Sequence, residues 1–154
     1  MSVFSTIVCS INLSESPDDI CQYVNDIVAR YEARLILVNI TPKAESVLRQ
    51  CSNKEMLAHL LEENRKANKE AFAEYVRTHF DSSPELVFAE GRIEEELIKV
   101  IDKYCADLVI IGSSSTRGFL GGFFNKTSEN IIGKTRVPVM VIPNELSLEC
   151  SPDF

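Results

Sequence analysis

The chain has 154 residues, 45% hydrophobic and 25% charged, which suits one compact domain with a buried core and not a disordered chain. The formal net charge of −7, from 16 basic and 23 acidic residues, argues against binding along a DNA or RNA backbone, which needs basic surfaces. No apolar run approaches the ~20 residues of a membrane-spanning helix, and the amino end carries no basic leader. We therefore expect a cytoplasmic protein with no membrane or nucleic-acid partner.

The cysteines indicate the same compartment. There are five, an odd number, and none belongs to a C-x-x-C pair. We expect Cys9, Cys21 and Cys105 to be small buried hydrophobic residues. A zinc site would need clustered ligands, and His59 and His79 lie near no cysteine pair, so the sequence predicts no metal site.

Short apolar segments alternate with helical patterns along the chain. The first strand is expected over residues 6–11. Ser16 and Pro17 then start a helix, because serine caps free N–H groups and proline suits the first helical position. The second strand is expected over residues 34–40, where a nearly continuous apolar run is typical of a sheet covered on both faces.

A long helix follows the second strand. Ser52 and Glu55 match the capping box S-x-x-E, which predicts the start of this helix. Apolar residues at helical spacing predict a buried stripe along its whole length. The members of the stripe are Leu57, Leu60, Leu61, Ala67, Ala71, Phe72, Tyr75 and Val76. A third strand is expected over residues 86–89.

The second half of the chain repeats the alternation. Gly91 turns the chain into a helix whose first turn carries three glutamates, as the helix macrodipole favours. The fourth strand is expected over residues 107–111, a short helix over 125–132, and the last strand over 137–143. Prolines in the last strand favour an edge position or a strand start, because they remove donors from the ladder.

This order of elements predicts an α/β fold. Strands that alternate with helices form a parallel sheet through right-handed crossovers, with helices on both faces. Residues 1–143 are expected to form a single domain, and residues 144–154 a polar, flexible C-terminal tail.

Ligands of open parallel sheets bind beyond the carboxyl ends of the strands. Asn12 follows the first strand, and Gly112 with a Ser/Gly-rich segment follows the fourth and leads toward a helix near Asn125. Such a loop can present N–H groups to a phosphate. It is equally typical of an ordinary connection in which glycines turn and serines cap, and the residues alone leave both readings open.

Known catalytic and nucleotide motifs are missing from the sequence. There is no Walker A motif, no G-x-G-x-x-G after the first strand, and no G-x-S-x-G nucleophile elbow. His59 and His79 fall on the long helix, away from the serine-rich loop, so a Ser-His-Asp triad is not indicated. We therefore predict no catalytic residue.

Four segments together resemble the universal stress protein family, and the resemblance covers the chain from Thr6 to Pro143. Residues 7–16 match the family's first strand and turn, and residues 90–93 its entry to the third helix. Residues 106–113 match its D-L-[IV]-[VI]-[ML]-G-[ST] signature, and residues 137–143 its closing strand. The resemblance implies a Rossmann-like, five-stranded parallel sheet in the order 3-2-1-4-5. It also implies a homodimer paired through the last strand, with Val137, Val139 and Val141 at the interface.

The resemblance also implies a candidate nucleotide site. Members that bind nucleotide carry G-x2-G-x9-G-[ST]-x-[ST] after the fourth strand, and Gly112 matches the first glycine. Asn12 stands where members usually hold an acidic residue, and Ile40 at the position whose backbone meets adenine. The candidate site comprises Asn12, Ile40, Gly112, Ser113, Ser115, Asn125, Lys126, Thr127 and Ser128.

Three departures from the family pattern bear on nucleotide binding. Asn125 stands at the third glycine, where a side chain obstructs close approach, although asparagine tolerates left-handed geometry. Lys126 stands at the first hydroxyl position, and Asn12 loses a charge-assisted bond. The family contains members that bind ATP and members that do not.

The resemblance with these departures implies a dimeric stress-response or signalling protein whose ATP binding is weak or absent. The alternative is a sensor that binds ATP or AMP, or a slow ATPase of the same family. A third alternative is an unrelated α/β enzyme that uses the same crevice, for which no acid–base pair or nucleophile is evident.

Overall fold

The structure is a computed structural model that describes residues 2–13, 18–43, 49, 52–112 and 126–142. The expected C-terminal tail, 144–154, lies outside the described residues. All of the Ser/Gly-rich segment after Gly112 does too.

Five strands form one parallel sheet in the order β3-β2-β1-β4-β5. This confirms the predicted fold class and strand order. A helix separates each strand from the next, and such crossovers make neighbouring strands parallel. The strands are β1 (Thr6–Ser10), β2 (Arg34–Thr41), β3 (Glu85–Glu90), β4 (Leu108–Gly112) and β5 (Val139–Ile142).

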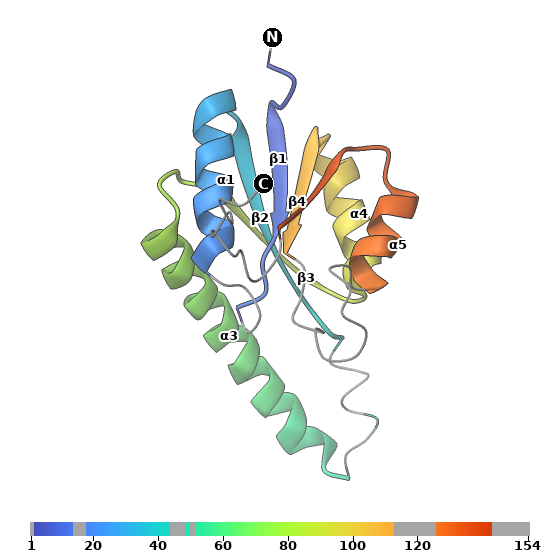
Figure 1. The fold of residues 1–154 in the computed structure, drawn as a ribbon. Coiled ribbons are helices and arrows are strands. Elements are labelled where there is room, and N and C mark those ends of the chain that lie inside the picture. Colours follow the sequence, from blue (N-terminus) through green and yellow to red (C-terminus); the bar gives the residue numbers. More distant parts are fainter. Residues whose placement is uncertain (1, 14–17, 44–48, 50–51, 113–125, 143–154) are drawn as a thin grey trace, which may run out of the picture.

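Helices cover both faces of the sheet. The helices are α1 (Asp18–Tyr31), α3 (Lys54–His79), α4 (Ile93–Tyr104) and α5 (Lys126–Lys134). Helices α1 and α3 pack on one face, and α4 and α5 on the other (Figure 1). Alternate residues of each strand therefore enter different cores, which explains the continuous apolar runs. None of the described helices has the long apolar stretch needed to cross a membrane.

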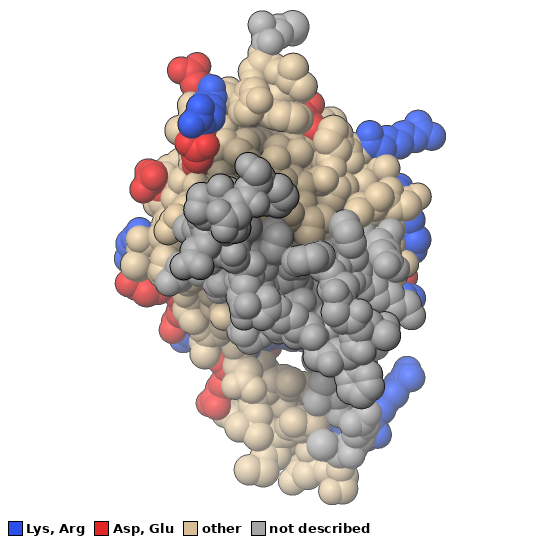
Figure 2. All heavy atoms as spheres, in the orientation of Figure 1, with Lys and Arg blue, Asp and Glu red and all other residues tan. Residues whose placement is uncertain are grey.

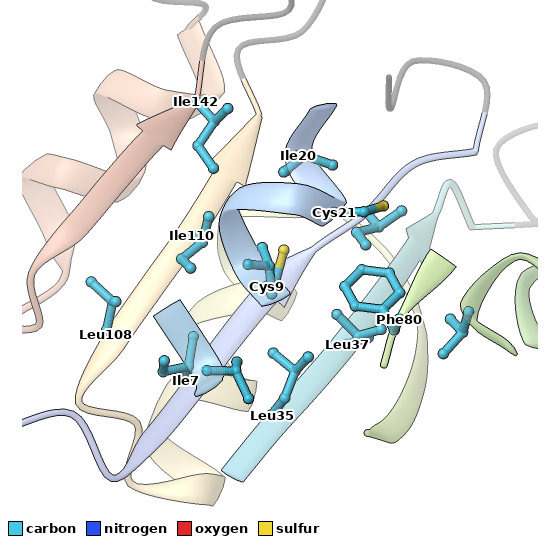
Figure 3. Close-up of a cluster of buried hydrophobic side chains, with 14 of the residues drawn as sticks. Ile7, Cys9, Ile20, Cys21, Leu35, Leu37, Phe80, Leu108, Ile110 and Ile142 are labelled. Atoms are coloured by element: carbon cyan, nitrogen blue, oxygen red, sulfur yellow. The ribbon is translucent and has the colours of Figure 1, made fainter. Parts of the chain in front are cut away.

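The core between the sheet and α1 includes two cysteines. Cys9 and Cys21 are buried, as predicted, among the isoleucines and leucines of β1, β2 and β4 (Figure 3). Burial raises the pKa of the Cys9 thiol far above its ordinary value, and the neighbouring Cys21 adds to the shift. The same prediction is wrong for Cys105, which is exposed. It caps the C-terminal end of α4 in the left-handed conformation (φ 51°), where the helix leaves the core.

The start of α3 differs from the prediction by one residue. Asn53 is the N-cap, and its side chain accepts a hydrogen bond from the Met56 N–H at 3.3 Å. The predicted capping box of Ser52 and Glu55 is therefore wrong. Both serine and asparagine cap helices well, so residue type alone does not decide between neighbouring positions.

The buried stripe of α3 is shorter than predicted. Phe72 and Val76 are its buried residues, whereas Leu60 is 44% exposed. The helix has 26 residues and spans about 39 Å, while the longest strand has eight residues and spans about 26 Å. The first turns of α3 consequently extend past the ends of the strands (Figure 1).

The turn between β3 and α4 requires a glycine. Gly91 has φ +151°, a conformation that residues with a side chain rarely adopt. A Cβ atom there would lie 2.9 Å from the Glu96 side chain. The Gly91 N–H donates to the Thr41 carbonyl at 2.9 Å, so this turn is tied to the end of β2.

Candidate functional site

The carboxyl ends of the three central strands meet at one edge of the sheet. Ser10, the last residue of β1, is aligned with Val38 of β2 on one side and with Ile111 of β4 on the other. One residue further, the Ile11 N–H donates to the Val38 carbonyl at 2.9 Å. From β1 the chain order runs outward in both directions, to β2 and to β4. This point is the topological switch at which open α/β sheets bind ligands.

Three predicted site residues follow these strand ends. Asn12 is exposed and comes directly after the segment that contacts β2. Gly112 ends β4 and is aligned with Ile142 of β5. Ile40 is 8% exposed and its side chain packs in the core under α4 and α5, so its backbone is the part that a ligand could reach. The geometry thus brings residues distant in sequence to a common edge.

The other predicted site residues are described in part or not at all. Ser113, Ser115 and Asn125 lie outside the described residues. Lys126, Thr127 and Ser128 form the first turn of α5, which follows β4 in the chain, and their side chains lie outside the described part.

A polar pair beside this edge, the buried Asn39 and the half-buried Asn68, was not predicted. Asn39 is 4% exposed, and its Nδ2 donates to the Ile11 carbonyl at 3.1 Å. Its Oδ1 accepts from Nδ2 of Asn68 on α3 at 2.8 Å. Asn39 therefore connects the end of β1 with α3. The signal in the sequence was a lone polar residue inside the apolar second strand, since buried amides require partners.

The three glutamates at the start of α4 interact with the helix and its neighbours. Glu94 is 9% exposed, and Arg92 Nη2 donates to its Oε1 at 2.8 Å. The pKa of Glu94 is lowered, chiefly because its carboxylate accepts a hydrogen bond from its own backbone N–H, and Arg92 adds to this. Glu96 pairs with Lys99 at 2.8 Å. These contacts agree with the predicted role in helix-end electrostatics, and the described residues include no group of three ligands suited to a metal ion.

Basic side chains are dispersed over one face of the described part of the molecule (Figure 2). On the face drawn in Figure 2 they lie in small separate groups near the outline of the molecule. Several are paired, such as Arg30 with Asp26 at 2.8 Å. That face therefore presents no broad basic area within the described part of the chain.

The sheet order and the converging strand ends define an α/β protein with a topological switch point beside β1, the place where ligands of such sheets generally bind. The sequence model of the Universal stress protein family matches residues 4–143, and the chain belongs to this family. The predicted resemblance is thus confirmed. A comparison with curated proteins gives no significant match.

Solved structures share the fold. Universal stress protein UspA from Lactobacillus plantarum matches with a TM-score of 0.68 and 15% identity, over 90% of this chain and 97% of that one. A universal stress protein in complex with cAMP matches with a TM-score of 0.61 and 17% identity, over 94% and 100%. A protein of the family from Burkholderia pseudomallei matches with a TM-score of 0.59 and 21% identity, over 93% and 98%. At these identities the likeness concerns the fold.

Proposed function

We propose that this universal stress protein is a dimeric stress-response or signalling protein of the cytoplasm whose ATP binding is weak or absent. The observation that carries the proposal is the altered loop at the switch point. Asn125 stands where nucleotide-binding members hold their third glycine, and Lys126 where they hold a hydroxyl residue.

The altered residues weaken phosphate binding for physical reasons. A glycine lets the backbone N–H groups approach a phosphate at a helix start, and the Asn125 side chain adds bulk at that position. Asn12 replaces a carboxylate, so a hydrogen bond to a ribose hydroxyl would no longer be charge-assisted. Neutral hydrogen bonds contribute about 0.5–1.5 kcal/mol, and those to charged groups about 1.5–3 kcal/mol.

The edges of the sheet support dimerisation through β5. Strand β3, at one edge, begins with Glu85 and ends with Glu90, and charged residues on an edge discourage pairing with another chain. Strand β5, at the other edge, has the sequence VMVI and no charge. An isologous pair of β5 strands, with Val137, Val139 and Val141 at the interface, fits this asymmetry.

Isothermal titration tests the nucleotide part of the proposal. The chain as it stands should show no micromolar binding of ATP or AMP. The triple variant Asn12→Asp, Asn125→Gly, Lys126→Ser rebuilds the family pattern and should gain clear binding of ATP. Lys134→Ser, which removes a lysine from the other end of α5, should gain none. Micromolar binding of ATP or AMP by the unmodified chain would refute the proposal.

The second candidate function is an adenine-nucleotide sensor or slow ATPase. It is favoured by the relative whose structure contains cAMP and by Gly112, which is retained at the end of β4. This function predicts that cAMP, AMP or ATP binds the unmodified chain and that Ser128→Ala weakens the binding. Slow release of phosphate from ATP would identify the ATPase form.

A further inference from the structure

We propose that the cavity between α3 and the carboxyl ends of β2 and β3 binds a small organic anion that carries a flat apolar group. This ligand site adjoins the nucleotide site discussed above and goes beyond the proposed function. The cavity is lined by Asn39 and Thr41, on either side of the predicted site residue Ile40, but by neither Asn12 nor Gly112.

The cavity has the size of a small-molecule site. Its volume is about 690 Å³, within the range of about 300–1,000 Å³ that is usual for ligand pockets. Residues between Leu61 and Lys69 of α3 form one wall, and the ends of β2 and β3 form the other. The α3 residues that line the cavity precede Phe72 and Val76, the buried residues of this helix.

One part of the lining suits a flat apolar group. The Phe88 ring lines the cavity together with Leu61 and Pro42. The Lys69 ammonium lies 5.5 Å from the centre of the Phe88 ring, within the range of a cation–π contact. A planar hydrocarbon group packed beside this ring would therefore have a positive charge next to it.

The charges of the wall favour an anion. Arg65 is already engaged, because Nη2 donates to Oε2 of Glu90 at 2.9 Å and Nη1 lies 3.3 Å from Oε2 of Glu62. Lys66 and Lys69 have no ion-pair partner among the residues that the structure describes. These two ammonium groups are thus available to a ligand carboxylate, in a chain that is acidic as a whole.

Two amides of the cavity wall, Asn39 and Asn68, are held in place by hydrogen bonds. Asn39 and Asn68 both line the cavity, and the hydrogen bonds from Asn68 to Asn39 and from Asn39 to Ile11 fix their orientation. Asn64, one turn before Asn68, adds an exposed amide to the same wall. A wall that is already ordered lowers the entropic cost of binding.

Two probes that differ in charge test the site. The 15N-labelled protein is titrated with 2-naphthoate and, separately, with the neutral 2-naphthamide. Naphthoate should shift the backbone amide signals of residues 61–69 and 88–90. Naphthamide should bind the same residues about tenfold more weakly, which corresponds to about 1.4 kcal/mol.

Matched lysine variants test the charged groups. Lys66→Gln combined with Lys69→Gln should weaken naphthoate binding about tenfold and weaken naphthamide binding much less, since naphthamide loses only the contact of its ring with Lys69. Lys54→Gln combined with Lys134→Gln removes the same charge outside the cavity and should change neither. All four positions are on helix surfaces, so these variants should fold.

Three results would overturn the proposal: no shift within residues 61–69, equal affinity for both probes, or an equal effect of the control pair. ATP titrated into the same labelled sample gives a second readout at Asn12 and Gly112, which do not line the cavity. Failure of the cavity proposal is therefore distinguishable from failure of the proposed function.

Discussion

At the scale of single residues, Asn39 joins two elements through its side chain. It is the one buried polar residue of the described part of β2, and its amide contacts a backbone carbonyl after β1 and a side chain of α3. A buried amide without partners costs about 1–3 kcal/mol, so its two hydrogen bonds decide whether the residue stabilises or destabilises the fold. Asn39 thereby couples the switch-point edge to the long helix.

Replacement of Asn39 should destabilise the protein. We expect Asn39→Ala to lower the free energy of unfolding by about 1–3 kcal/mol, because the Ile11 carbonyl and the Asn68 amide both lose their partner. Urea denaturation measures the change. In a double-mutant cycle, Asn39→Ala and Asn68→Ala should be non-additive. The control is Asn64→Ala, at an exposed asparagine of α3, which should change the free energy of unfolding by less than about 0.5 kcal/mol. An equal effect of Asn39→Ala and Asn64→Ala would contradict the stabilising role of Asn39.

Glu94 should make the stability depend on pH. Its pKa is lowered in the folded protein by the bond to its own backbone N–H and by Arg92. The charged form is thus favoured by folding, and its contribution is complete above the ordinary pKa of 4.5 and is lost as the pH falls through the lowered folded value. We expect Glu94→Gln to lower the free energy of unfolding by about 0.5–1 kcal/mol at pH 7 and by progressively less below pH ~4.5.

Glu95→Gln is the matched control for this pH dependence. Glu95 is in the same helical turn, but its side chain is 54% exposed and 3.5 Å from Arg92. Its replacement should cost less at pH 7, since exposed pairs contribute little. A cost of Glu94→Gln that persists unchanged in acid would show that packing, and not charge, is responsible.

At the scale of elements, hydrophobic periodicity predicted where helices and strands occur. It did not predict how much of each apolar face is buried. The stripe from Leu57 to Val76 has helical spacing throughout, yet burial is confined to its second half, around Phe72. Burial depends on the length of the neighbouring strands, which local spacing does not encode. The same limit applies to the Asn39–Asn68 pair, because it requires that α3 passes over the end of β2.

The sequence predicted the switch-point edge better than it predicted the Asn39–Asn68 pair. Asn12 and Gly112 could be assigned to a common edge because each follows an apolar strand, and parallel strands end on the same side of a sheet. The strand order itself came from the family resemblance and is confirmed by the structure. The cavity under α3 had no local signal, since its walls come from three separate elements.

Strand β5 should carry the dimer interface. The Val109 N–H donates to the Pro138 carbonyl at 3.0 Å, so in a parallel ladder the N–H groups of Val139 and Val141 point away from β4. We expect Val139→Glu and Val141→Glu each to weaken association at least about tenfold, because a carboxylate would be buried without a partner. Light scattering across a dilution series measures this.

Both valines are half-buried against the core under α4 and α5, so folding must be measured as well. Circular dichroism of each variant should show a folded monomer. Val141→Pro removes one outward N–H without a charge and should also weaken the dimer. Val3→Glu, at a position 76% exposed, is the control for the added charge and should leave association unchanged. An unchanged dimer in both glutamate variants would exclude an interface through β5.

At the scale of the whole molecule, the two faces of the sheet have different roles. The face covered by α4 and α5 carries α5, which follows β4 in the chain, and includes residues of the uncharged edge strand β5. The face covered by α1 and α3 carries the part of α3 that lines the cavity. The central strand β1 belongs to both cores, and the Ile11 carbonyl that follows it accepts the Asn39 bond, so the two faces meet at the switch-point edge.

The net charge predicts how dimerisation responds to salt. Two chains of charge −7 with centres ~35 Å apart repel by about 6 kcal/mol in unscreened water. With a Debye length of about 30 Å at 0.01 M salt, about a third of this repulsion remains, and with a length of about 8 Å at 0.15 M almost none does. We expect the dimer to tighten about tenfold, measured by sedimentation at several concentrations.

A less acidic variant separates this repulsion from other effects of salt. Changing Glu63, Glu70 and Glu74 on the exposed side of α3 to glutamine reduces the charge from −7 to −4, and because repulsion scales with the square of the charge it should fall to 16/49, about one third. The salt dependence of association should weaken accordingly. If salt instead loosened the dimer, ion pairs across the interface would outweigh the repulsion, and the uncharged strand β5 would not be its centre.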